Sequence, residues 1–171
     1  MRCFRITKYN PINRNELGKF TADDWTSVYD VGKVYLGSKL TFEKYLFYEE
    51  MYIEVIKIIM ESNAQTLRIE DLEKNEYTHF SDLFASGMQK SYNSIENENE
   101  ISLNNIDLIA RSILREIIWC KLVSKSMFVH FGYDLYMYIG CENFPCEKLE
   151  SFKEKGLFFE EMDSPYLDLE Q

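Results

Sequence analysis

The sequence lacks the motifs that build many known catalytic and nucleotide-binding sites. It has no Gly-x-Gly-x-x-Gly turn, no P-loop, no His-Glu-x-x-His pair and no Gly-x-Ser-x-Gly nucleophile turn. Only two histidines are present, His79 and His130, although histidine is the side chain that most readily exchanges protons near neutral pH. We therefore expect no catalytic residues, no cofactor-binding residues and no enzymatic activity.

Metal sites and membrane spans are also unsupported. The cysteines Cys3, Cys120, Cys141 and Cys146 have neither the spacing nor the histidine neighbours typical of a zinc site. No apolar run approaches the roughly 18 residues that a membrane helix needs, and no signal-length apolar stretch follows Met1. We therefore expect a cytoplasmic protein with reduced thiols, without a metal ion and without a membrane partner.

Basic residues are too few for a nucleic-acid-binding surface. The chain has 29 acidic residues against 19 basic ones, a formal net charge of -10, whereas phosphate binding needs an electropositive face. Residues 70–107 carry nine acids and two lysines, and residues 1–20 carry five bases and one acid. This distribution predicts an acidic face and a basic protein partner, although charge of this kind also serves solubility alone.

Hydrophobic periodicity predicts one α+β domain over residues 1–171. The expected architecture is an antiparallel or mixed sheet of about four to five strands with two long helices packed on it. The expected strands are 2–9, 66–72, two strands in a hairpin over 127–140, and 157–162, with a short strand around 27–29. The expected helices are 42–62 after an N-cap at Thr41, 102–122 after a cap at Ser102 or Asn104, a short one from 77, and 146–155, while 93–100 forms an acidic loop.

Two patterned ends carry a resemblance to a known group of proteins. Near the start stand Lys8-Tyr9-Asn10-Pro11-Ile12-Asn13-Arg14, Gly18-Lys19-Phe20 and Asp24-Trp25-Thr26-Ser27-Val28-Tyr29-Asp30-Val31-Gly32; near the end stand Gly156-Leu157-Phe158-Phe159-Glu160-Glu161 and Ser164-Pro165-Tyr166. Both resemble bacterial immunity proteins encoded beside polymorphic toxins. The resemblance implies an antitoxin that binds and neutralises the toxin domain of a contact-dependent growth inhibition system, or a similar one, by protein–protein interaction.

An acidic inhibitor of this kind would occlude a basic toxin domain, such as a nuclease. We expect the contacts to come from exposed acids and an aromatic residue of the middle loop and the 127–140 hairpin: Glu76, Asp82, Glu96, Glu98, Glu100, Tyr133 and Asp134. Half-buried packing is the alternative for the tyrosines of the hairpin. Two other functions stay open: a small hydrolase that uses His130 with Asp134, and a structural or adaptor subunit.

Overall fold

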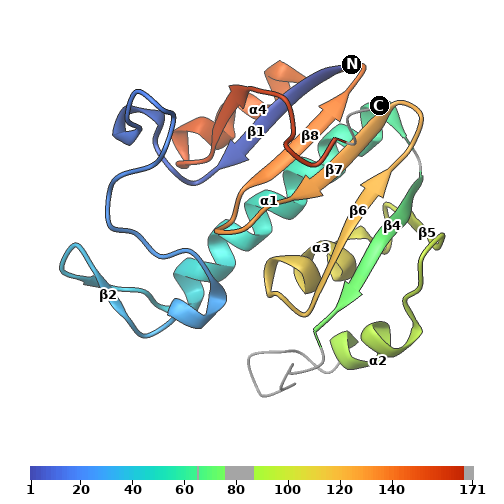
Figure 1. Ribbon diagram of the computed structural model, residues 1–171, viewed down its shortest axis with the longest axis horizontal. Coiled ribbons are helices and arrows are strands. Elements are labelled where there is room, and N and C mark those ends of the chain that lie inside the picture. Colours follow the sequence, from blue (N-terminus) through green and yellow to red (C-terminus); the bar gives the residue numbers. More distant parts are fainter. Residues whose placement is uncertain (65, 76–86, 168–171) are drawn as a thin grey trace.

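The protein folds around one seven-stranded antiparallel sheet (Figure 1). The computed structural model describes residues 1–64, 66–75 and 87–167. In spatial order the strands are β5 (Glu100–Ser102), β4 (Thr66–Lys74), β6 (Ile118–Val123), β7 (Met127–Phe131), β8 (Met137–Cys141), β1 (Arg2–Thr7) and β9 (Phe158–Glu161). A separate hairpin of β2 (Val34–Tyr35) and β3 (Ser38–Lys39) extends from the body.

Four α-helices accompany the sheet in the described residues: α1 (Phe42–Asn63), α2 (Gly87–Ser94), α3 (Ile106–Leu114) and α4 (Cys146–Glu154). In Figure 1, α1 and α3 lie behind the strands, and α1 also contacts α4. Two short 3-10 helices, η1 (Pro11–Asn13) and η2 (Val28–Asp30), lie in the long segment between β1 and α1. The α+β class agrees with the expectation. The expected four to five strands and two long helices were too few, because the sheet has seven strands and the described residues contain four α-helices.

The largest error lies in the helix expected over residues 102–122. The helix α3 instead ends at Leu114, because the backbone of Glu116 adopts a left-handed conformation with φ 58°. The Glu116 amide then donates to the Ile113 carbonyl, and the Ile117 amide donates to the Ser112 carbonyl, both at 2.9 Å. This pair of bonds forms a Schellman motif, which satisfies the last carbonyls of the helix. The chain reverses there and continues as β6.

The other boundary errors are smaller. The residue that precedes α3 is Asn105, without a side-chain cap, so the caps expected at Ser102 or Asn104 are absent. The strand expected around 27–29 is the 3-10 helix η2. Glu100, expected in an acidic loop, begins the edge strand β5. The helix expected from residue 77 begins outside the described residues.

The long helix α1 is the main element behind the sheet. Its Thr41 cap is confirmed, since the Thr41 hydroxyl accepts the Lys44 amide at 3.2 Å. Its buried face includes Tyr52 and Ile56, both 0% exposed. In the described residues, no helix combines the length and the apolar character needed to cross a membrane.

Candidate functional site

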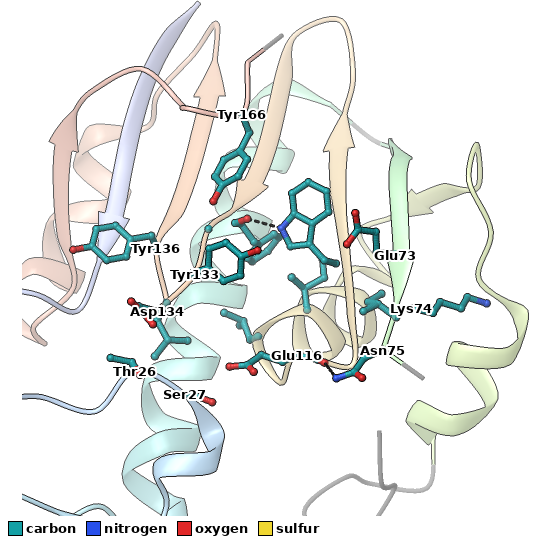
Figure 2. A pocket seen from close by; sticks show the side chains of 17 residues that line it. Thr26, Ser27, Glu73, Lys74, Asn75, Glu116, Tyr133, Asp134, Tyr136 and Tyr166 are labelled. Atoms are coloured by element: carbon teal, nitrogen blue, oxygen red, sulfur yellow. Dashed lines mark hydrogen bonds between the residues drawn. The ribbon is translucent and has the colours of Figure 1, made fainter. Parts of the chain in front are cut away.

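A pocket of about 620 Å³ opens between the last residues of β4 and β7, the first residues of β6 and the segment that precedes η2. It is lined by residues 26–27, 73–75, 113–114, 116, 118–119, 131–136 and 166, which are drawn in Figure 2. A pocket of roughly 300–1,000 Å³ is large enough for a small ligand or a long side chain of a partner. This pocket is the best candidate for a functional site.

The turn between β7 and β8 forms one wall of the pocket. Asp134 and Leu135 both have φ 59°, and the Tyr136 amide donates to the Tyr133 carbonyl at 3.2 Å, as in a type I′ turn. Such a turn favours Asn and Gly, so Leu135 needs support from its surroundings. Two tyrosine hydroxyl groups stabilise the turn by hydrogen bonds: Tyr9 donates to the Asp134 carbonyl at 2.6 Å, and Tyr52 donates to the Leu135 carbonyl at 2.7 Å.

The opposite wall comes from the turn between α3 and β6. Glu116 occupies the position where helices commonly place glycine, and its side chain is exposed at the pocket. The Asn75 amide group donates to the Glu116 carbonyl at 3.2 Å, which ties the end of β4 to this turn. Residues in left-handed backbone conformations concentrate at functional sites. Glu116, Asp134 and Leu135 all have this conformation and all line the pocket.

The charge in the pocket is negative. Its carboxylates belong to Glu73, Glu116 and Asp134, and none of them forms a salt bridge with another described residue. Lys74 also belongs to the lining, but in Figure 2 its side chain extends away from the acidic groups. Its ammonium nitrogen lies 5.3 Å from the ring centroid of Tyr92 on α2. The acids therefore line the pocket without a salt bridge to any cation that the structure describes.

Aromatic rings complete the pocket. Tyr133 is 86% exposed at its rim. The Trp119 indole is fixed, because its N–H donates to the Phe131 carbonyl at 2.7 Å and its ring lies 5.9 Å from the Tyr166 ring. Burial, followed by the proximity of Tyr133, raises the pKa of the Tyr166 hydroxyl. Burial, and then the charge of Glu116, likewise raises the pKa of Tyr29, which is 50% exposed nearby.

The C-terminal segment lies on the outer face of the sheet and holds Tyr166 in place. The His130 Nδ1 atom and the Ser164 hydroxyl are 2.8 Å apart, and the Ser164 hydroxyl also accepts the Tyr166 amide at 3.2 Å. His130 is stacked on Phe128 with 4.4 Å between ring centroids. His130 and Ser164 are only 3% and 5% exposed, so neither side chain is open to a substrate.

The residues expected to bind the toxin fall into two areas. Tyr133 and Asp134 meet in the pocket, whereas Glu96, Glu98 and Glu100 lie on and before β5. Glu98 forms a salt bridge with Arg68 at 2.8 Å, and Glu100 pairs with Arg68 across the strands. Arg68 is six residues from Lys74 along β4, so the two areas are separated by roughly 20 Å. Glu76 and Asp82 lie outside the described residues.

Sequence reasoning missed the part of the pocket contributed by β4, the α3–β6 turn and the C-terminal segment. The missed residues are Glu73, Glu116, Trp119 and Tyr166. The expectation of one helix over 102–122 hid Glu116 as a helical surface residue. Spacing alone could not have placed Glu73 in the same pocket as Asp134, because a register irregularity lies between Glu70 and Glu73 on β4.

In residues 1–64, 66–75 and 87–167, no group of three or more His, Cys, Asp or Glu side chains could hold a metal ion. All four cysteines are free thiols. Burial raises the pKa of Cys120 to about 12. Comparison with protein-family models, with curated proteins and with solved structures finds no match for this chain.

Proposed function

We propose that this chain is an immunity protein that acts in the cytoplasm, where it binds and neutralises a cognate bacterial toxin domain. The observation that carries the proposal is the pocket itself, which is lined by the exposed ring of Tyr133 and by three carboxylates without salt-bridge partners among the described residues. Unpaired acids attract a basic partner, and tyrosine is enriched among residues that dominate binding energy.

The size of a typical protein interface fits this proposal. A stable complex buries about 800 Å² on each partner, an area large enough to include both the pocket and the acids near β5. A net charge of -10 would speed the encounter with a basic toxin domain. Inhibition would follow from covering the basic surface that the toxin uses, without any reaction catalysed by this chain.

The hydrolase alternative has less support. It required His130 to act with Asp134, but His130 is 3% exposed and does not line the pocket that contains Asp134. A general base must reach the proton that it removes, either directly or through one water molecule. A substrate in the pocket would meet Asp134 and not the His130 ring.

Co-expression with a toxin domain encoded beside this chain tests the proposed function. The wild-type chain should restore growth, and reversal of charge in the variant Glu116→Lys/Asp134→Lys should abolish the rescue while the far-UV circular dichroism spectrum stays unchanged. Both side chains are exposed, so the fold should tolerate the changes. Full rescue by this variant would contradict neutralisation through the acidic pocket.

A further inference from the structure

We infer that the pocket receives the guanidinium group of one arginine side chain of the partner protein. This inference rests on the proposed function and adds the chemistry of the group that is bound. The pocket, at about 620 Å³, holds carboxylates from three separate segments: β4, the α3–β6 turn and the β7–β8 turn. Glu73, Glu116 and Asp134 supply only acceptors when they are ionised, so they select a ligand with several hydrogen-bond donors.

The aromatic part of the pocket distinguishes arginine from lysine. A guanidinium group is planar, has five donors in a fixed arrangement, stacks on aromatic rings and sheds water more easily than an ammonium group. The rings of Tyr133 and Trp119 line the same pocket as the carboxylates, and the indole N–H of Trp119 is already bonded to the Phe131 carbonyl. The Trp119 ring is therefore held in one orientation, as a stacking surface needs.

No resident cation among the described residues competes for this position. The Lys74 ammonium lies by Tyr92, and Figure 2 shows its side chain directed away from Glu116 and Asp134. The more buried Glu160 carboxylate, in contrast, bonds to both Arg5 and Arg14, at 2.9 and 3.1 Å. The three pocket acids are exposed and form no salt bridge with a described residue, so they are available to a cation of another molecule.

The two tryptophans make binding directly measurable. In the ¹⁵N-labelled full chain, each indole N–H gives one signal; Trp119 lines the pocket, whereas Trp25 is 2% exposed in the core and serves as an internal control. The Trp119→Phe variant assigns the signals. Titration with N-acetyl-arginine amide should shift the Trp119 signal progressively, N-acetyl-lysine amide should shift it less, and neither should move the Trp25 signal.

Matched controls isolate the charge. N-acetyl-citrulline amide has the shape of the arginine probe without its charge, and it should leave the Trp119 signal in place. Glu116→Gln should weaken arginine binding roughly 2- to 5-fold, as expected for the loss of a partly exposed ion pair. Glu154→Gln, on α4 and outside the pocket lining, should leave binding unchanged. An equal response to citrulline, or unchanged binding in Glu116→Gln, would overturn the arginine assignment.

Growth rescue separates this inference from the proposed function. If the wild-type chain and Glu154→Gln, a change on α4 outside the pocket lining, rescue cells but Glu116→Gln/Tyr133→Ala does not, both proposals gain support. If all three rescue equally, the toxin is neutralised without the pocket and the arginine inference is wrong. If the wild-type chain rescues no strain that expresses a neighbouring toxin domain, the proposed function fails. A Trp119 signal that still responds to arginine but not to citrulline would then indicate that the pocket binds another cationic ligand. In that case the assignment to an arginine of a toxin would be overturned.

Discussion

The ion pair between α1 and α3 gives the sharpest prediction about stability. The Glu49 side chain is 0% exposed and that of Arg115 is 5% exposed. The Glu49 carboxylate accepts two hydrogen bonds from Arg115, at 2.6 and 2.8 Å, and a further one from Arg111. Arg111 also bonds to Glu50, whose side chain is 58% exposed. Adjacent carboxylates on one helix thus share a partner but differ completely in burial.

The substitution Glu49→Gln should remove the carboxylate that pairs with the buried Arg115 guanidinium. Removing one member of a buried pair costs about 3–5 kcal/mol, a large share of the roughly 5–15 kcal/mol that stabilises a whole domain. The matched control Glu50→Gln should cost less than about 1 kcal/mol, because water surrounds this carboxylate. The double variant Glu49→Met/Arg115→Met should recover most of the loss, since it replaces both members of the buried pair by apolar side chains.

Urea unfolding, followed by tryptophan fluorescence and far-UV circular dichroism, measures these differences. With a urea dependence of about 2–3 kcal/mol per molar, Glu49→Gln should lower the unfolding midpoint by roughly 1–2 M. Glu50→Gln should lower the unfolding midpoint by no more than about 0.5 M. Equal midpoints for the two single variants would refute the argument that burial of Glu49 makes its pair with Arg115 decisive.

Three further changes should affect stability in defined ways. Burial lowers the pKa of Lys8 from 10.5 to about 8, although Asp24 acts in the opposite direction. Between these two pKa values the unfolded chain holds more protons than the folded chain, so the free energy of unfolding rises with pH. In urea titrations, wild type should gain roughly 2 kcal/mol relative to Lys8→Met from pH 7 to 9.5. In Gly140→Ala the new Cβ would stand 2.1 Å from the Phe128 ring, so urea unfolding should show a loss of about 1–3 kcal/mol, which Phe128→Leu partly restores. Glu116→Gly should raise stability by about 0.5–1 kcal/mol, because it relieves a left-handed backbone, while weakening arginine binding in the Trp119 titration. Failure of the pH trend, of the Phe128 rescue or of the stability gain would contradict the respective argument.

The elements that the sequence predicted well have local signals at both ends. The helix α1 follows an N-cap threonine, and α4 ends before Gly156, which has φ 92°. The hairpin of β7 and β8 was expected around Gly132, and it forms there. Strands β1, β4 and β9 also lie within one or two residues of the expected ranges. Caps, glycines and alternating side chains are physical constraints within a few residues, so they can be identified without the fold.

The elements that the sequence missed depend on distant contacts. Ile117, Ile118 and Leu122 fit a helical period, yet two of them belong to β6, where Leu122 pairs with Ile69 of β4 and Val129 of β7. Sheet neighbours on both sides outweigh a local helical pattern. The edge strand β5 has three residues, and β2 and β3 have two each, which is too short for a periodic signal.

The site was predictable only where exposure could be inferred from a turn. Tyr133 and Asp134 stand beside Gly132 in the expected hairpin, so their position at the surface followed from the sequence. Glu116 could not be identified, because glycine is the usual signal of a helix end and glutamate occupies that position here. Glutamate is disfavoured in a left-handed backbone conformation, so Glu116 lowers stability at this position. Its place in the pocket offers a reason for that cost.

The end of α3 therefore links stability to the site. Arg115 turns inward to Glu49, and the next residue, Glu116, turns outward to the pocket. A change at Glu49 should disturb the turn as well as the core, so it should alter the Trp119 response to arginine even though Glu49 lies outside the pocket lining. Glu116→Gln should alter that response without lowering stability. A Glu49→Gln chain that loses stability but binds arginine normally would show that the turn keeps its shape without the buried pair, and the two roles would then be independent.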